Sequence, residues 1–186
     1  MNIDKDNLRK EYLKIRKNIL AKDIKSHIIT KKIIDTNEYH TAKVIAIYNN
    51  LTQEVSTKEL IKYSLNHNKI VLLPRVNNNE MIFYKITTLN DFFIKSPFGI
   101  QEPLPIKENQ INSDKIDLMI IPGVCFDKEK NRLGFGKGYY DKYLENTNIK
   151  KIGICFEDQV LRDKIIPTDK YDIKMDIVIT EKKISL

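Results

Sequence analysis

Short apolar runs recur along the chain and alternate with amphipathic stretches and with turns rich in Asn, Gly and Pro. Apolar runs of four to eight residues with many β-branched side chains are typical of buried strands. The clearest run is Leu-Met-Ile-Ile at residues 118–121, which Pro122 and Gly123 end. The same pattern predicts further strands at residues 44–48, 69–75, 81–86, 149–156 and 177–180.

Apolar residues three or four apart predict helices between most of these strands. Residues 2–18 form the first helix, and Asp23 caps a second helix that runs to about Asn37. Ser56 and Glu59 have the spacing of a capping box at the start of a third helix, over residues 56–66. Two short helices are predicted at residues 139–144 and 158–163, and loops at residues 92–105 and 167–176.

Strands that alternate with helices predict an α/β fold. We expect a mostly parallel central sheet with helices on both faces, in a Rossmann-like three-layer arrangement. The sequence contains no repeat and no low-complexity linker, so residues 1–186 are expected to form a single domain. Binding sites in such folds lie beyond the carboxyl ends of the strands.

The charge of the chain narrows the classes of partner. The net charge is +7, and the sequence pI is about 9.2. The lysines are nevertheless spread along the whole chain among Asp and Glu, which argues against a dedicated nucleic-acid site. A positive surface of this kind would still attract anionic small molecules such as nucleotides and folates.

Two further features concern the cell compartment. The two cysteines, Cys125 and Cys155, are not in a C-x-x-C arrangement and lie in or beside apolar runs, so we expect buried, reduced thiols. No stretch resembles a signal peptide or a membrane span. The sequence therefore predicts a cytoplasmic protein without a membrane partner, and we expect a monomer.

Candidate chemistry is concentrated after the strand at residues 118–121. Arg132 precedes glycine at positions 134, 136 and 138, and Lys137 lies between the last two glycines. Such a loop lets backbone N–H groups approach an anion closely. It matches neither the P-loop nor the G-x-G-x-x-G pattern, and glycine alone would indicate only a turn. Together with the cations, Asp127 and Asp141 supply the hard oxygen ligands of a magnesium–nucleotide site.

This stretch carries a family resemblance. PGVCFD at residues 122–127 and RLGFGKGYYD at residues 132–141 resemble the signature of the 5-formyltetrahydrofolate cyclo-ligase family, whose members are also called methenyltetrahydrofolate synthetases. The resemblance extends over nearly the whole chain and is weakest at residues 75–93. Three further matches are KDNLR at residues 5–9, EVST at residues 54–57 and FGIQEP at residues 98–103.

The resemblance implies an enzyme that uses Mg²⁺ and ATP to close 5-formyltetrahydrofolate to 5,10-methenyltetrahydrofolate, with ADP and phosphate released. The γ-phosphoryl group would be transferred to the formyl oxygen, and the second folate nitrogen would then displace phosphate. Its partners are therefore expected to be two small molecules, a reduced folate and ATP.

The resemblance also implies the site residues. Lys137, Arg132 and Tyr139 would be catalytic, and Asp141 and Asp172 would hold Mg²⁺. The residue before that second aspartate is Tyr171, where relatives often have histidine or another polar residue. The expected ATP-binding residues are Lys5, Arg9, Arg132, Leu133, Gly134, Phe135, Gly136, Lys137, Gly138, Tyr139 and Tyr140. The expected folate-binding residues are Asn49, Glu54, Phe98, Phe135, Gly136, Lys137, Gly138 and Tyr139.

Two alternatives remain open on the sequence. One is a different ATP-dependent ligase or kinase on a similar scaffold, because the glycine loop indicates phosphate and only the region of Glu54 indicates a pterin. The other is a basic RNA-binding module, against which stand the missing aromatic RNP pattern and the dispersed lysines.

Overall fold

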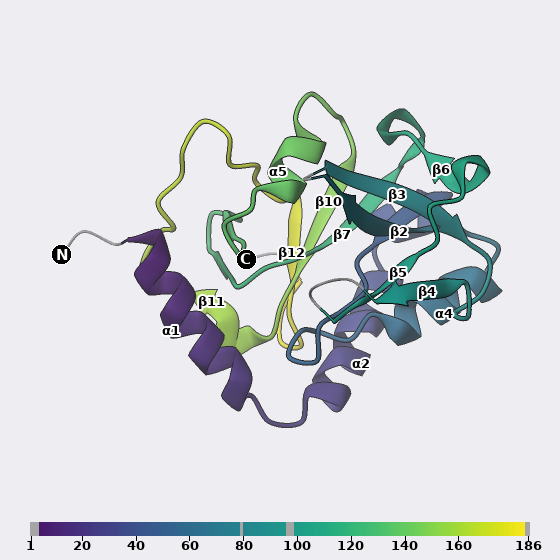
Figure 1. The fold of residues 1–186 in the computed structure, drawn as a ribbon. Helices are drawn as coiled ribbons and strands as arrows, with labels where there is room; N and C mark the ends of the chain where they lie inside the picture. Colours follow the sequence, from purple (N-terminus) through teal and green to yellow (C-terminus); the bar gives the residue numbers. More distant parts are fainter. Residues whose placement is uncertain (1–3, 79, 96–98, 185–186) are drawn as a thin grey trace.

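The computed structural model describes residues 4–78, 80–95 and 99–184 of the chain (Figure 1). The α-helices are α1 (Lys5–Asn18), α2 (Lys22–Ile34), α3 (Asn37–Thr41), α4 (Lys58–Asn66) and α5 (Tyr139–Leu144), with 3₁₀-helices at Lys107–Asn109, Ser113–Lys115 and Glu157–Gln159. The strands are β1 (Val44–Ile47), β2 (Ile70–Asn77), β3 (Glu80–Ile86), β4 (Phe92–Lys95), β5 (Gln101–Pro103), β6 (Gln110–Ile111), β7 (Leu118–Pro122), β8 (Cys125–Asp127), β9 (Arg132–Leu133), β10 (Lys150–Ile154), β11 (Val160–Leu161) and β12 (Ile177–Ile179).

Seven strands form the main sheet in the order β12-β10-β7-β1-β2-β3-β6. The four pairs from β12 to β2 are parallel, and β3 and β6 add an antiparallel edge. The prediction of an α/β fold with a mostly parallel central sheet is confirmed. Parallel strands are buried on both faces, which explains why the β7 run reads as continuously apolar.

Alternate residues of the central strands enter two separate cores. On one face, Ile45 and Ile120 pack with side chains of α2, α3 and α4, including Ile33, Tyr39 and Leu60. The opposite face buries the intervening residues under α5, β8 and the segment that precedes β12, and these residues include Ala46, Met119, Phe126, Leu144 and Met175. The loops beyond the carboxyl ends of β1, β2 and β7 are left to form a site.

A small three-stranded sheet, β11-β8-β9, lies beside α1 (Figure 1). Leu8 and Tyr12 of α1 pack on its apolar residues, among them Cys125 and Leu133. The sequence predicted a plain loop where β8 and β9 form a hairpin, because each strand is too short to give a periodic signal.

Asp127 closes this hairpin and is fully buried. Its carboxylate accepts hydrogen bonds from the backbone N–H groups of Glu129, Asn131 and Ile166 and from the Asn131 side chain. The expectation that Asp127 supplies a metal ligand is therefore wrong, since its oxygens are already used to hold two loops together.

Two predicted helix caps are also wrong. Ala21, with φ 53°, precedes α2, and Asp23 lies within the first turn of that helix. Helix α4 follows Thr57 rather than Ser56, and the N–H of Ser56 donates to the Ser26 hydroxyl. Between α2 and β1 the chain starts a separate short helix, α3, which Thr36 caps by accepting from the N–H of Tyr39.

Two segments predicted from their turn residues differ in the structure. Residues 92–105, predicted as a loop, contain the antiparallel pair β4 and β5. Residues 158–163, predicted as a short helix, contain the end of a 3₁₀-helix and then β11, which pairs with β8. In both cases pairing with another strand decides the conformation, and sequence periodicity does not report such pairing.

We expect Asp91 to stabilise the turn between β3 and β4 in a pH-dependent way. Burial opposes its charge, but hydrogen bonds from the hydroxyls and backbone N–H groups of Thr87 and Thr88 lower its pKa from 3.8 to about 2. The stabilisation is therefore present above the unfolded pKa and is lost as the pH falls through the folded one. Asp91→Asn should cost about 1 kcal/mol of unfolding free energy at pH 7, after allowance for solvent screening. Thermal unfolding should show no such difference near pH 2, and a difference that persists there would contradict this assignment.

Candidate functional site

A pocket of about 990 Å³ opens beyond the carboxyl ends of β1, β2 and β7. The start of α1, the loop after β1, the glycine loop, α5 and the segment 169–173 all contribute side chains. The polar residues of its wall are Lys5, Arg9, Tyr48, Asn49, Glu54, Glu102, Arg132, Lys137, Tyr139, Tyr140, Asp141, Lys142, Glu145, Asp169, Lys170, Tyr171 and Asp172. The site thus lies where an α/β fold is expected to place it.

The glycine loop joins β9 to α5 along one wall of this pocket. Gly136 has φ +91°, in the region that favours glycine, and a Cβ there would lie 3.4 Å from the Arg9 guanidinium carbon. At Gly134 a Cβ would lie 2.7 Å from Nη1 of Arg132. The loop therefore needs glycine because two arginine side chains pack against its backbone.

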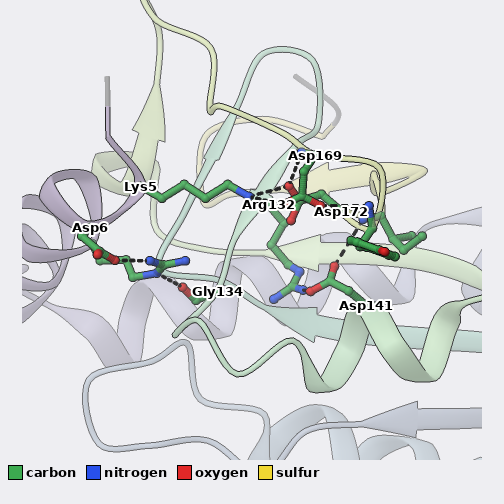
Figure 2. A network of polar contacts seen from close by, with 10 residues as sticks. Lys5, Asp6, Arg132, Gly134, Asp141, Asp169 and Asp172 are labelled. Atoms are coloured by element: carbon green, nitrogen blue, oxygen red, sulfur yellow. Dashed lines mark hydrogen bonds and ion pairs between the residues drawn. The ribbon is translucent and has the colours of Figure 1, made fainter. Parts of the chain in front are cut away.

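Three of the four predicted phosphate-binding cations are held by carboxylates (Figure 2). Lys5 Nζ lies 2.6 Å from Asp172 and 3.2 Å from Asp169. Arg132 Nη2 lies 2.7 Å from Asp141. Burial opposes the charge of Lys5, but the bonds to Asp172 and Asp169 raise its pKa, so Lys5 stays protonated.

Arg9 is the third of these cations. It pairs with Asp6 one turn earlier on α1, and its Nε donates to the carbonyl of Gly134 at 2.9 Å (Figure 2). The start of α1 is thereby attached to the glycine loop, although the two are far apart in the sequence. This explains why a short cationic motif at the N-terminal end of the chain can belong to the same site.

Lys137 differs from the other three cations. Its side chain is exposed and lines the pocket, and it makes no hydrogen bond or ion pair within the described ranges of the chain. A lysine that no carboxylate holds can turn its ammonium group to an incoming anion without first breaking a contact.

Glu54 lies in the opposite part of the pocket, in the loop after β1. Its side chain is buried, and its oxygens accept from the N–H of Leu51 at 2.9 Å and from Nη1 of Arg16 at 3.3 Å. Burial raises the pKa of Glu54, which these two donors partly offset. Each oxygen can still accept a further hydrogen bond from a ligand.

The structure brings nearly all of the predicted site residues to this one pocket. All the expected ATP-binding residues line it, as do both predicted metal ligands and Asn49 and Glu54 of the expected folate set. Phe98 lies outside the described residues. The roles assigned to these residues stay predictions.

The sequence analysis missed three polar residues of the site. Arg16 lies in the predicted first helix, where its spacing gives no sign of burial. Glu102 is buried in the pocket wall, with one oxygen 3.9 Å from Nη1 of Arg75. Asp169 holds Lys5 together with Asp172. A buried charged residue carries no local sequence signal, because its burial depends on segments distant in the chain.

The described residues contain no group of three or more His, Cys, Asp or Glu side chains that could hold a metal ion by itself. Asp141 and Asp172 both line the pocket, and Oδ1 of Asp141 accepts from the N–H of Ile173, next to Asp172. Two carboxylates beside a phosphate site are a sufficient protein contribution for Mg²⁺, which keeps waters and takes its other ligands from the nucleotide.

An α/β fold whose strand ends carry a cation-rich glycine loop and a buried carboxylate defines a protein that binds small anionic ligands. The sequence profile of the 5-formyltetrahydrofolate cyclo-ligase family matches residues 2–181. The chain belongs to this family, as the resemblance predicted.

Individual relatives agree with the family match. The chain is 33% identical over 187 residues to the 5-formyltetrahydrofolate cyclo-ligase of Haemophilus influenzae, covering 94% of this chain and 97% of the relative. It is 33% identical over 168 residues to the mouse protein of the same name, covering 84% and 82%. The NMR structure of Aquifex aeolicus 5,10-methenyltetrahydrofolate synthetase superimposes with a TM-score of 0.84 at 32% identity, covering 97% of this chain and 91% of that chain.

The structure also bears on the membrane question. In the part of the chain that it describes, no helix is both long enough and apolar enough to cross a bilayer.

Proposed function

We propose that the protein converts 5-formyltetrahydrofolate to 5,10-methenyltetrahydrofolate with hydrolysis of ATP to ADP and phosphate. One observation carries this proposal: a single pocket joins the cation-rich glycine loop to the buried carboxylate Glu54. The loop suits a nucleotide phosphate chain, and the carboxylate suits the N–H donors of a pterin.

On the nucleotide side, Lys5, Arg9, Arg132 and Lys137 neutralise the phosphates, and the backbone of the glycine loop lies against them. Three of these cations are already placed by ion pairs, so the site is organised before ATP arrives. When ATP binds, its phosphate oxygens compete with Asp172 and Asp141 for Lys5 and Arg132.

The carboxylates released in this way are the two predicted ligands of Mg²⁺. Asp141 and Asp172 would hold the ion against the phosphate oxygens. When bound, Mg²⁺ would offset the charge that develops on the transferred phosphoryl group. The hard oxygen donors present fit this ion.

On the folate side, Glu54 accepts hydrogen bonds from the pterin edge. Tyr139 and Phe135 of the glycine loop lie in the wall of the same pocket and place the folate beside the nucleotide. Asn49 donates to the carbonyl of Gln101 at 2.8 Å, which fixes β5 against the loop after β1. The pocket therefore has a defined shape around both substrates.

The proposed reaction has two steps. The formyl oxygen attacks the γ-phosphorus, and the bond from that phosphorus to the bridging oxygen of ADP breaks. The second folate nitrogen then attacks the formyl carbon, the carbon–oxygen bond breaks, phosphate leaves, and the nitrogen loses its proton. Such phosphoryl transfer asks the protein chiefly for positioning and charge neutralisation, which these residues supply.

A near-ultraviolet absorbance assay with purified protein, Mg-ATP and 5-formyltetrahydrofolate tests the proposal. We expect the methenyl product to accumulate with ATP present and not when ATP is omitted. If no product forms while Mg-ATP still binds, the phosphate site would stand and the folate assignment would be wrong.

The variant Glu54→Gln tests the folate side of the pocket. An amide of the same shape presents one N–H group where the pterin needs an acceptor, so the folate KM should rise about 10- to 100-fold. The KM for ATP should stay within about twofold of the parent value, because Glu54 is not among the expected phosphate contacts. Equal changes in both KM values would argue against a pterin contact.

Acidification should weaken folate binding in the parent protein for the same reason. Because burial raises the pKa of Glu54, its carboxylate protonates at a higher pH than that of an exposed glutamate. The folate KM should therefore rise as the pH falls through this raised pKa, and Glu54→Gln should lack that rise.

A single domain over residues 1–186, a monomeric state and a cytoplasmic location stay predictions. Two small-molecule substrates account for the site, so the proposed reaction requires neither nucleic acid nor a membrane.

A further inference from the structure

Arg16 is a buried cation at the rear of the site, and the proposed reaction does not use it directly. It lies on α1, is 2% exposed, and donates through Nη1 to Oε1 of Glu54 at 3.3 Å. Its guanidinium carbon also lies 5.3 Å from the centre of the Phe135 ring. One side chain therefore contacts both the folate carboxylate and the glycine loop.

This arrangement is a poor device for stabilising a fold. A buried ion pair loses about as much in desolvation as it gains in attraction. Nε of Arg16 is also buried without a hydrogen-bond partner in the described part of the chain, and such an unpaired donor carries a further cost. The pair is more economically explained by what it does to Glu54.

The surroundings of Glu54 otherwise oppose its negative charge. Besides Arg16, the titratable groups that act on it are the buried phenols Tyr48 and Tyr140, which are neutral because burial raises their pKa. The hydroxyl of Tyr48 donates to the carbonyl of Val55 and is not directed at Glu54. Only the Leu51 N–H and Arg16 offset the burial of this carboxylate.

We propose that Arg16 is a positioning residue for folate: it keeps Glu54 ionised and oriented toward the pterin, and it holds Phe135 of the glycine loop at the edge of the same subsite. This inference rests on the proposed function. It adds that folate affinity depends on a residue outside the binding motifs, and that the contact to Phe135 links the folate subsite to the phosphate loop.

Four variants separate this role from a merely structural one. Arg16→Met removes the charge, and Arg16→Lys keeps it. Lys17→Met is the matched control, because Lys17 is the next residue on α1 and its side chain is exposed. The double variant of Arg16→Met with Glu54→Gln removes both charges and avoids an unpaired buried carboxylate if the single variant does not fold.

The KM values for 5-formyltetrahydrofolate and for ATP are measured from about pH 6 to about pH 9, across the range in which a shifted carboxyl group would titrate. For Arg16→Met we expect the folate KM to rise at least about tenfold at neutral pH and to recover as the pH rises and Glu54 ionises. The ATP KM should change less than about twofold. Arg16→Lys should restore most of the folate affinity, and Lys17→Met should resemble the parent protein.

Non-additivity gives a second readout. If Arg16 acts through Glu54, the double variant should bind folate no worse than Glu54→Gln alone. Additive losses, equal changes in both KM values, or a pH-independent loss would each overturn the inference. Absence of turnover in the parent protein would instead overturn the proposed function, and the inference with it.

Discussion

Lys137→Ala is expected to reduce kcat by about 100- to 1,000-fold while leaving the fold intact, an effect of the size seen when one well-placed charge donor is removed from a transition state. Lys137 lines the pocket with an exposed side chain that contacts no other described residue. Its loss should therefore change the free energy of unfolding by less than about 0.5 kcal/mol. Steady-state kinetics and thermal unfolding of the same preparation measure both quantities.

Lys128→Ala is the matched control for this variant. Lys128 is an exposed lysine on the turn between β8 and β9, and it does not line the pocket. The control removes the same charge from the protein, so any general effect of net charge on substrate attraction appears in both variants. Near-normal turnover of Lys137→Ala would refute the role assigned to Lys137.

Asp141→Asn is expected to have the second large effect. The substitution removes a predicted Mg²⁺ ligand, so the Mg²⁺ concentration needed for half-maximal activity should rise by at least about tenfold, since even indirect partners of metal ligands cost about 10- to 100-fold in affinity. It also leaves Arg132, whose side chain is 5% exposed, without its carboxylate partner. Because asparagine still offers one acceptor, the expected loss of unfolding free energy is about 1–3 kcal/mol.

Titration of activity with Mg²⁺ at fixed ATP measures the first effect, and chemical denaturation measures the second. Asp163→Asn is the control, because Asp163 is exposed and does not line the pocket. An unchanged Mg²⁺ requirement together with a reduced stability would show that Asp141 serves only to pair with Arg132.

Much of this site could be predicted from the sequence because its parts are local. The glycines around Lys137 follow a strand and precede a helix within one short stretch, and that stretch carries the family signature. Lys5 and Arg9 could be assigned only through the family resemblance. The structure supplies the physical link, the bond from Arg9 to the carbonyl of Gly134.

What the sequence could not reveal depends on contacts between distant segments. Arg16 looked like one of many solvated lysines and arginines of the first helix, yet it is buried against Glu54. Asp127 looked like a metal ligand, but its partners include the N–H of Ile166, far along the chain. The strands β8, β9 and β11 are two or three residues long and are defined by pairing alone.

The measurement that tests the central claim most directly follows the formyl oxygen. If the γ-phosphoryl group is transferred to that oxygen before ring closure, 5-formyltetrahydrofolate labelled there with oxygen-18 must deliver its label to the released phosphate. Mass spectrometry of the phosphate after turnover in unlabelled water should show one labelled oxygen per methenyl product formed. Unlabelled phosphate, with the label in water, would show that ATP is hydrolysed without activating the formyl group and would contradict the account.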